Sequence, residues 1–165
     1  MEKIVIRKAK REDSSILLNL IKKLAHYQRM DHEVITTTKQ LEDMIFNQHA
    51  SDVLLIDYQQ KVVGYALYFK GFSSFLGAYT MHLEDIYIEE NYRHLGLGKQ
   101  LFLAVVQEGI KQDCRRLDWS CLNWNDNAHR FYQSLGGKKS ITWQNYSMSG
   151  EMMRNIGGIE NDPNE

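Results

Sequence analysis

Proline and cysteine are scarce in this chain. The one proline, Pro163, lies in a polar terminal stretch, so no proline interrupts a strand or helix before it. Cys114 and Cys121 are the only cysteines among 165 residues, and the six residues between them match no zinc-binding spacing. We interpret both as reduced thiols of a cytoplasmic protein that serve as small apolar side chains. Glycine and hydrophobic period must therefore mark the element boundaries.

Long apolar runs and an excess of charge are also absent. No stretch approaches the roughly 18 to 20 apolar residues of a membrane span, and residues 1–7 are too polar for a signal peptide. The 20 Lys and Arg residues nearly balance the 21 Asp and Glu residues, for a formal net charge of -1. This balance removes a general attraction to nucleic acid, and no close histidine pair suggests a metal site. We expect no membrane, nucleic acid or metal ion as a partner.

The size and composition indicate one globular domain. A chain of 165 residues, 43% of them apolar or aromatic, can bury a full core without disulfides or metal. We expect a single domain over residues 1–157 and a polar tail over 158–165, with no internal repeat.

Strand patterns alternate with helical ones, which predicts a mixed α/β fold. Dense runs of strand-forming residues predict strands at 4–7, 53–56, 62–69, 78–89 and 117–121. The second and third of these flank a polar segment, which favours an antiparallel hairpin. One more short strand is expected after the last clear helix.

Helical spacing predicts four helices before the C-terminal region. Leu17, Leu20, Ile21 and Leu24 form the apolar stripe of the first helix, and the third runs from Leu97 to Ile110. Capping residues are expected at Asp13 for the first helix, at Thr37 with Gln40 for the second, and at Asn125 and Gly136 for the fourth.

Two glycines separate the third strand from the long helix, in the run Arg93-His94-Leu95-Gly96-Leu97-Gly98-Lys99-Gln100. Glycine lets backbone approach a ligand closely, and a helix N-terminus offers unpaired N–H groups and a positive dipole end, which together suit phosphate oxygens. The segment lacks residues that a dinucleotide fingerprint or a Walker A loop requires. By itself it is either an anion site or a plain tight turn.

The spacing Arg93-x-x-Gly96-x-Gly98 after a strand resembles the acetyl-coenzyme A loop of the GNAT N-acetyltransferases. Residues 125–136 are similar to that family's later helix, Asn-x-x-Ala-x-x-Phe/Leu-Tyr-x-x-x-Gly, and residues 83–88 resemble the spermidine/spermine N-acetyltransferase-like (diamine acetyltransferase) branch. The resemblance implies a single-domain α/β GNAT fold. Its mixed, mostly antiparallel twisted sheet would splay at the cofactor site and carry helices on both faces.

The resemblance also implies where acetyl-coenzyme A binds. The pantetheine arm would pair like an added strand with the backbone at Ile86 and Ile88, and loop amides would hold the diphosphate. The implied cofactor-binding residues are Ile86, Ile88, Arg93, His94, Gly96, Gly98, Lys99, Asn125 and Tyr132. For Asn125, a plain helix cap is equally compatible with the sequence.

Acetyl transfer to nitrogen needs a neutral amine, yet an alkylamine titrates near 10.4. Strand alternation puts Glu84 beside Ile86 and Ile88 on one face, and Asp85 with Tyr87 on the other. A carboxylate in that setting tends to have a raised pKa, which suits a general base acting directly or through water. A solvent-facing Glu84, or Asp85 as the base, are the alternatives. In the branch that the sequence resembles, the first carboxylate of Leu-Glu-Asp usually has this role, so Glu84 is our candidate.

Tyr132 is the proton donor that the resemblance implies for the leaving thiolate. An unperturbed tyrosine titrates near 10 and a thiol near 8.5, so full transfer is uphill by about 2 kcal/mol and hydrogen-bond assistance is favoured. The helical spacing of Tyr132 equally fits a core position. Neither cysteine has an evident histidine partner, so we expect direct attack in a ternary complex.

The acceptor pocket is expected around the segment that joins the first two helices. The candidate substrate-binding residues are Tyr27, Asp31, Glu33, Glu84 and Trp143. A charged loop is also typical of plain solvated surface. Polyamine-acetylating relatives tend to be more acidic here and near residues 72–75, which read Phe-Ser-Ser-Phe, so diamines or lysine-like amino acids fit at least as well as polyamines.

The sequence therefore predicts an acetyl-CoA-dependent N-acetyltransferase that modifies a primary amine of a small molecule. A protein or peptide N-acetyltransferase and an inert cofactor-binding module are the alternatives. Relatives in this branch often pair, so we expect a homodimer in which residues 148–156 contact the partner copy.

Overall fold

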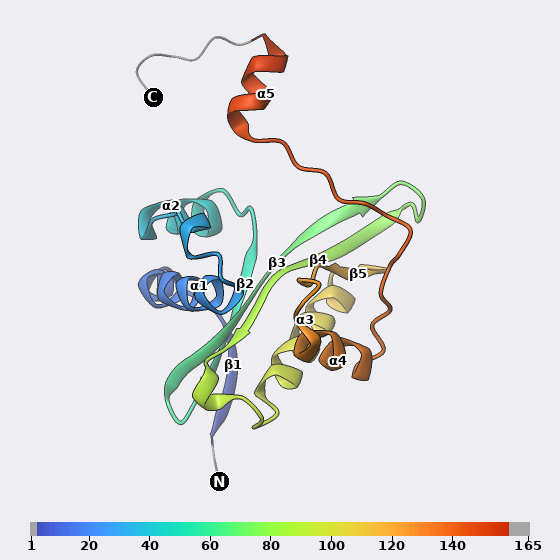
Figure 1. Ribbon diagram of the computed structural model, residues 1–165. Coiled ribbons are helices and arrows are strands. Elements are labelled where there is room, and N and C mark those ends of the chain that lie inside the picture. The colour runs from blue at the N-terminus through green and yellow to red at the C-terminus, as the bar shows by residue number, and fades with distance from the viewer. Residues whose placement is uncertain (1–2, 159–165) are drawn as a thin grey trace. The chain divides into compact units, whose positions relative to one another are not determined.

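The computed structural model describes residues 3–158 (Figure 1). The chain forms two compact units that divide after Asn123. The expected tail at 158–165 lies, beyond its first residue, outside the described residues.

The first unit contains a five-stranded sheet in the order β1-β2-β3-β4-β5. Its strands are β1 (Ile4–Lys8), β2 (Asp52–Tyr58), β3 (Lys61–Ser73), β4 (Ala78–Ile88) and β5 (Leu117–Trp119). Neighbours from β1 to β4 are antiparallel, and β5 is parallel to β4. The predicted hairpin is confirmed, and its turn residues Gln59 and Gln60 both have positive φ, at 50° and 67°. Positive φ at both central residues is typical of a type I′ turn.

Helices cover both faces of this sheet (Figure 1). The elements of the first unit are η1 (Arg11–Asp13), α1 (Ser14–Gln28), η2 (Asp31–Glu33), α2 (Thr38–Glu42), η3 (Asp43–Asn47), η4 (Glu90–Tyr92) and α3 (Leu97–Lys111). Because both faces are covered, β2 is buried on both sides, which accounts for its unbroken apolar run Val53-Leu54-Leu55-Ile56.

The face under α1 carries one apolar cluster. Leu17, Leu20 and Leu24 of α1 pack there with Tyr65 of β3 and Tyr87 of β4. The predicted stripe of the first helix is therefore confirmed, and each fully buried leucine contributes roughly 1.5 to 3 kcal/mol by leaving water. On the opposite face, α3 packs against β2, β3 and β4 and buries Leu97, Leu101 and Val105, which are four residues apart.

Of the helix caps predicted for α1 and α2, only the one for α2 is formed. Thr37 and Gln40 form the expected capping box, in which the Gln40 N–H donates to Thr37 Oγ1 at 3.2 Å. Asp13 stands at the N-cap of α1, but its side chain does not cap that helix. Arg7 of β1 instead donates to both Asp13 carboxylate oxygens, at 2.8 and 3.0 Å, and its Nε donates to Asp57 at 2.9 Å. The Asp13 carboxylate is thus held by a charge-assisted bidentate pair with Arg7 and by the Lys10 N–H, which donates to Oδ2 at 2.7 Å, so it is directed away from α1.

We expect Asp13→Asn to lower the free energy of unfolding by about 1 to 3 kcal/mol at neutral pH, because it removes a charged hydrogen-bond partner of Arg7. Arg7 holds the pKa of Asp13 below its ordinary value. This contribution is thus complete above the unfolded pKa of about 3.9 and is lost as pH falls through the lower folded value. Urea unfolding of the wild type and the variant at several pH values measures the difference, which should shrink in acid. Glu12→Gln, at the exposed neighbouring residue, should change stability little, and an equal loss there would contradict the assignment.

The second unit contains α4 (Asp126–Ser134) and α5 (Gly150–Gly157). The predicted caps of α4 are confirmed: Asn125 Oδ1 accepts the Ala128 N–H at 3.2 Å, and Gly136 follows the helix with φ of 88°. The strand expected after this helix is wrong for the described residues, which show none between 135 and 149. A strand needs a neighbouring strand, and the described part of this unit has no other.

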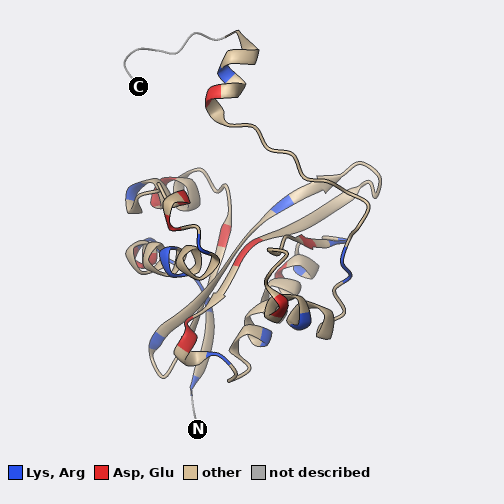
Figure 2. Ribbon diagram, in the orientation of Figure 1, with Lys and Arg blue, Asp and Glu red and all other residues tan. Residues whose placement is uncertain are grey.

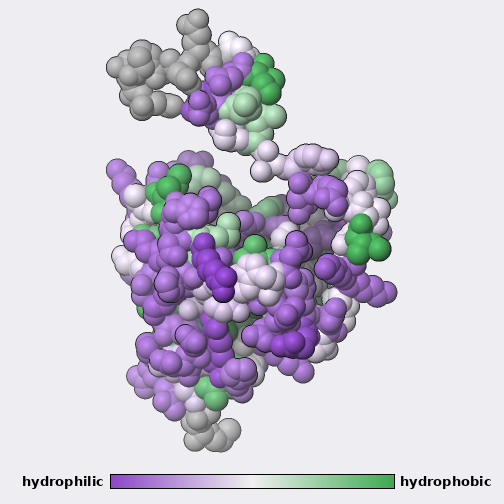
Figure 3. Space-filling model, viewed as in Figure 1, coloured by the Kyte–Doolittle hydropathy of each residue, from purple (hydrophilic) through white to green (hydrophobic). Residues whose placement is uncertain are grey.

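Helix α5 carries exposed apolar side chains, visible in Figure 3. They include Met152, Met153 and Ile156. None of the helices within residues 3–158 is long and apolar enough to cross a bilayer.

Candidate active site

Strand β4 contains a β-bulge at Glu84. Leu67 of β3 pairs with Asp85, whereas the next residue, Tyr68, pairs with Leu83, which leaves Glu84 as the extra residue. A bulge bends a strand and re-aims the side chains on either side of it, and bulges are common beside active sites.

The bulge also reverses which edge of β4 each backbone group faces. Before it, the Met81 N–H donates to the Arg116 carbonyl beside β5 at 2.8 Å. After it, the Glu89 N–H donates to the Val63 carbonyl of β3 at 2.8 Å. Positions 81 and 89 are both odd, so in a strand without a bulge their N–H groups would face the same edge. The backbone groups of the even position Ile88 therefore face the edge away from β3.

This edge of β4 is open after the bulge. Strand β5 pairs only with Met81, His82 and Leu83, so within the described part of the first unit no strand pairs with β4 from Glu84 onward. The resemblance implies a splay of the sheet here, and the pairing of β4 with β5 ends at this point. The N–H and C=O groups of Ile86 are thereby directed to an unoccupied strand position.

Three chemically active side chains lie together on the α1 face of the bulge. Tyr65 and Leu67 of β3 belong to the core under α1, and Phe69 shares their face. The ring of His82 stacks on that of Phe69 with centroids 4.9 Å apart, and His82 Nε2 is 3.4 Å from Glu84 Oε2. The Tyr65 hydroxyl donates to Asp85 Oδ2 at 3.0 Å. His82, Glu84 and Asp85 are thus neighbours on one face.

The predicted alternation along β4 is therefore wrong after Leu83. Glu84 and Asp85 share a face instead of lying on opposite faces, because the bulge inserts one residue between them and the earlier part of the strand. Ile88 lies on the other face and packs directly over Gly64 of β3. A Cβ at Gly64 would come within 2.6 Å of Ile88 Cδ1.

The two carboxylates have different surroundings. Glu84 has a side chain that is 56% exposed. Asp85 is partly buried, and this burial raises the pKa of its carboxyl, with a further upward contribution from the charge of Glu84 and a downward one from the Tyr65 hydrogen bond. The apolar setting that the alternation assigned to Glu84 is thus found at Asp85. The site holds one exposed carboxylate beside one that is sequestered and fixed in orientation.

The loop before α3 contains two residues in the left-handed backbone conformation. Gly96, the N-cap of α3, has φ of 76°, and His94 has φ of 65°. The first N–H of α3 that makes a helical hydrogen bond is that of Gln100, which donates to the Gly96 carbonyl at 3.2 Å. The preceding N–H groups, at Gly98 and Lys99 among others, have no partner in the helix and point out of its positive end.

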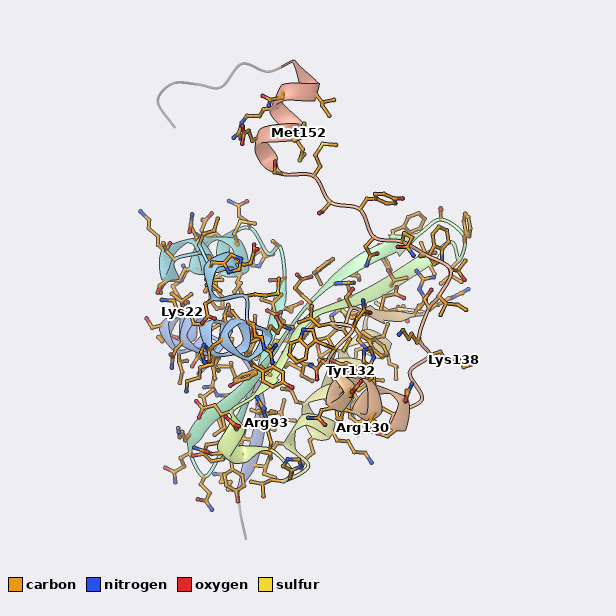
Figure 4. The ribbon with its side chains drawn as sticks, in the orientation of Figure 1. Lys22, Arg93, Arg130, Tyr132, Lys138 and Met152 are labelled. Carbon is orange, nitrogen blue, oxygen red and sulfur yellow. The ribbon has the colours of Figure 1, made fainter. Side chains whose placement is uncertain are left out.

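Arg93 begins this loop, but its side chain turns back to the sheet and α1 (Figure 4). Its Nε donates to the Ile88 carbonyl at 3.1 Å. Its Cζ lies 4.5 Å from the ring centroid of Tyr27 and 5.5 Å from that of Tyr87. The guanidinium therefore ties the loop to α1 and β4.

A second tie lies one helical turn earlier on α1. Lys23 Nζ is 2.6 Å from Glu89 Oε1, and Lys61 Nζ is 3.5 Å from Glu89 Oε2. The Glu89 side chain is only 14% exposed, so this ion pair is better shielded than an ordinary surface pair. Lys23 and Tyr27 together clamp both ends of the η4 turn that leads into the loop.

For the acetyl-CoA that the sequence resemblance implies, we expect Arg93→Lys to raise KM by about tenfold with a smaller change in kcat. A lysine cannot reproduce both the planar stack on Tyr27 and the hydrogen bond to the Ile88 carbonyl. We expect this to reduce the free energy that holds the loop in its conformation by about 1 to 2 kcal/mol. Initial rates at varied acetyl-CoA concentration measure the change. Arg11→Lys, at an exposed arginine near α2, is the control and should leave both constants unchanged. A wild-type KM in Arg93→Lys would show that the stack does not order the loop.

The expected acceptor segment is well exposed. Asp31 and Glu33 both lie in η2, with side chains 63% and 62% exposed. Each has a histidine beside it: His26 Nδ1 is 2.9 Å from Asp31 and His32 Nε2 is 3.3 Å from Glu33. Tyr27, in contrast, packs on Arg93. On the face in view, acidic and basic residues are interspersed over this region (Figure 2).

The remaining expected site residues belong to the second unit. Asn125 caps α4, and Tyr132 lies on α4 with its ring centroid 5.2 Å from that of Phe131 (Figure 4). Trp143 is 76% exposed. Among residues 3–158, no group of three or more His, Cys, Asp or Glu side chains could hold a metal ion.

A sequence model of the acetyltransferase (GNAT) family matches residues 17–137, which include the bulged strand, the loop and α4. The chain belongs to this family. The protein is thus an N-acetyltransferase, and family membership implies the use of acetyl-CoA.

Similar proteins agree with the predicted branch of this family. Thialysine N-epsilon-acetyltransferase from Bos taurus is 29% identical over 94% of this chain and 98% of its own. Spermidine/spermine N(1)-acetyltransferase-like protein 1 from Homo sapiens is 29% identical over 82% of this chain and 21% of its own. The fold matches an integron cassette protein from the V.cholerae mobile metagenome, with a TM-score of 0.78 and 23% identity over 93% of this chain and 97% of that one.

Proposed function

We propose that the protein transfers the acetyl group of acetyl-CoA to a primary amine of a small molecule by direct attack in a ternary complex. The observation that carries this proposal is the bulge at Glu84. It places two carboxylates on one face of β4 at the point where the strand edge opens. The same strand continues through the η4 turn into the loop that precedes α3, where His94 and Gly96 have positive φ.

The described residues fit acetyl-CoA. Acetyl-CoA supplies an acetyl group activated as a thioester. The open backbone groups of Ile86 would pair with the pantetheine arm, and the N–H groups of Gly98 and Lys99 suit the diphosphate. The Ile88 carbonyl already accepts a hydrogen bond from Arg93. We therefore propose that Arg93 orders the loop and that the Ile88 N–H donates to the pantetheine arm.

Glu84 is the proposed general base. Its exposed carboxylate can take a proton from the acceptor ammonium, directly or through one water, and the freed lone pair then attacks the thioester carbonyl. Asp85, held by Tyr65, adds a second negative group that attracts the ammonium before it is deprotonated. The resulting oxyanion would be stabilised by a backbone N–H near Ile86.

Tyr132 is the proposed donor to the departing sulfur. A hydroxyl that donates to the thiolate lowers its basicity and makes coenzyme A a better leaving group. Because a tyrosine proton is held more tightly than a thiol proton, a hydrogen bond is sufficient and full transfer is not required. Asn125 is proposed to contact the cofactor's arm.

The proposed acceptor is a lysine-like amino acid or a diamine. The thialysine-modifying relative matches nearly the whole chain, which supports an acceptor with a terminal alkylamine on a short stem. Asp31 and Glu33 would attract the far cationic group of such an acceptor, and Trp143 would supply an apolar wall. Two exposed carboxylates, each beside a histidine, make a weaker polycation site than a larger acidic cluster would.

The wider assignments are part of the same proposal. Residues 1–157 would act as one functional domain in a cytoplasmic homodimer. The exposed apolar side chains Met152, Met153 and Ile156 of α5 would contact the partner copy.

Thiol release from acetyl-CoA with a panel of amines tests the function. We expect fastest release with thialysine, lysine, ornithine or short diamines, and slower release with spermidine. Release with peptides alone would replace this proposal by a peptide N-acetyltransferase. Acetyl-CoA binding without release by any amine would replace it by a cofactor-binding module.

A further inference from the structure

His82 is held beside Glu84 in an orientation that joins it to solvent. One face of its ring packs on Phe69, with centroids 4.9 Å apart and planes tilted by 34°. Its Nε2 lies 3.4 Å from Glu84 Oε2, and the side chain remains 34% exposed. This distance is slightly longer than an ordinary hydrogen bond, and such pairs in active sites commonly tighten only when substrate binds. The imidazole thus contacts the proposed base on one side and water on the other.

Charged groups of β5 and of β4 itself lie on the same face of the sheet as this imidazole. Asp118 of β5 pairs with His82 in the parallel register, so both side chains project from the same face. Asp118 Oδ2 also accepts from Arg116 Nε at 2.8 Å. On β4 itself the neighbours are Glu84 and Asp85. A positive charge formed transiently on His82 would lie beside the Glu84 carboxylate, which stabilises it electrostatically, whereas the charge of Asp118 is balanced by Arg116.

From β3, the groups that face this part of β4 are Phe69 and the hydroxyl of Tyr65. Phe69 packs on the His82 ring, and Tyr65 donates its proton to Asp85. Asp85 is thereby engaged, and Glu84 is the carboxylate that His82 reaches. The arrangement separates one fixed carboxylate from one that can exchange a proton with an imidazole.

We propose that His82 is a positioning residue that orients Glu84 and carries the acceptor's proton from Glu84 to solvent. This inference rests on the proposed role of Glu84 as the general base. Glu84 must lose this proton before the next turnover, and a bound acceptor would cover its exposed side, so His82 adds an exit on the side away from the acceptor.

The proton moves in three balanced steps. An N–H bond of the acceptor ammonium breaks as an O–H bond forms on Glu84, which leaves the lone pair on the amine. That O–H bond breaks as an N–H bond forms at His82 Nε2. The imidazolium then releases its Nδ1 proton to water or buffer, and exchange with water restores the starting tautomer. The net change is one proton transferred from the amine to solvent.

Two substitutions at His82 separate proton transfer from packing. His82→Gln keeps a donor beside Glu84 but cannot carry a proton, and His82→Ala opens a space for free imidazole. We expect kcat to fall by about tenfold or more in both, with both KM values within about twofold of wild type. Added imidazole should restore part of the kcat of His82→Ala and none of that of His82→Gln. The acid limb of the kcat profile against pH should move in both variants.

Several results would overturn the inference. A wild-type kcat in His82→Gln, or a slow His82→Ala variant that does not respond to imidazole, would show that His82 carries no proton. His49→Gln, at an exposed histidine before β2, is the control and should keep the wild-type rate. Glu84→Gln separates the two claims. If it retains activity, the proposed base is wrong, whereas if only His82→Gln retains activity, the base stands and the relay alone fails.

Discussion

Glu84→Gln is expected to lower kcat by about 10² to 10⁴-fold, the usual contribution of a general base. Glutamine has nearly the same shape but cannot accept the ammonium proton, and at neutral pH only a very small fraction of an alkylamine is unprotonated. Steady-state thiol release at saturating acetyl-CoA and amine measures the loss. The loss should shrink as pH rises toward 10, because more of the acceptor is then already neutral.

Two comparisons complete this test. Glu12→Gln removes an exposed carboxylate from η1, outside the site, and should retain the wild-type kcat. Asp85→Asn should raise the KM for the amine more than it lowers kcat, since Asp85 is assigned to attracting the ammonium. The opposite pattern, with an active Glu84→Gln and an inactive Asp85→Asn, would transfer the role of base to Asp85.

Tyr132→Phe is expected to lower kcat by about 10 to 100-fold while the Kd for acetyl-CoA stays within about twofold. A hydrogen bond to a developing thiolate is worth about 1.5 to 3 kcal/mol, and it strengthens only as the charge forms. Rates give kcat, and calorimetry with acetyl-CoA gives Kd. The two measurements distinguish loss of a donor from loss of a packed ring.

Tyr146→Phe is the matched control for this change. Tyr146 lies in the same unit and is 95% exposed, so removal of its hydroxyl should alter neither constant. An unchanged kcat in Tyr132→Phe would remove Tyr132 from the chemistry and leave it as a structural residue of α4.

The elements with strong local signals could be predicted from the sequence. The leucine stripe of α1, the capping box at Thr37 and the Asn125 cap of α4 each depend on residues within one or two helical turns. The role of Asp13 could not be predicted this way, because its partner Arg7 comes from β1 and the pair forms only when strand and helix meet. The prediction of a strand after α4 was wrong for a related reason, because a strand forms only when a neighbouring strand pairs with it.

The bulge did leave a signal in the sequence. Aliphatic residues and methionine occupy odd positions at Met81 and Leu83 and then even positions at Ile86 and Ile88. The phase change falls across Glu84 and Asp85, where one extra residue is inserted. Strict alternation missed it because it assumes an unbroken period of two.

The site was predictable in its local parts and not in its tertiary ones. The glycine loop and the Glu-Asp pair are contiguous motifs, so both are visible in the sequence. The stack of Arg93 on Tyr27 and the pairing of His82 with Phe69 join distant segments, and their geometry depends on the register of β3 with β4. Sequence spacing places Arg93 at a phosphate loop but does not show which way its side chain turns.

Acetyl-CoA binding at the open edge of β4 and the loop before α3 is the step on which the proposed function depends most directly. Isothermal titration calorimetry of the folded protein with acetyl-CoA and with coenzyme A measures this binding without any assumption about the acceptor. We expect one site per chain with a Kd on the order of micromolar for both ligands. Absence of binding by either ligand, on protein shown to be folded by circular dichroism, would contradict the account.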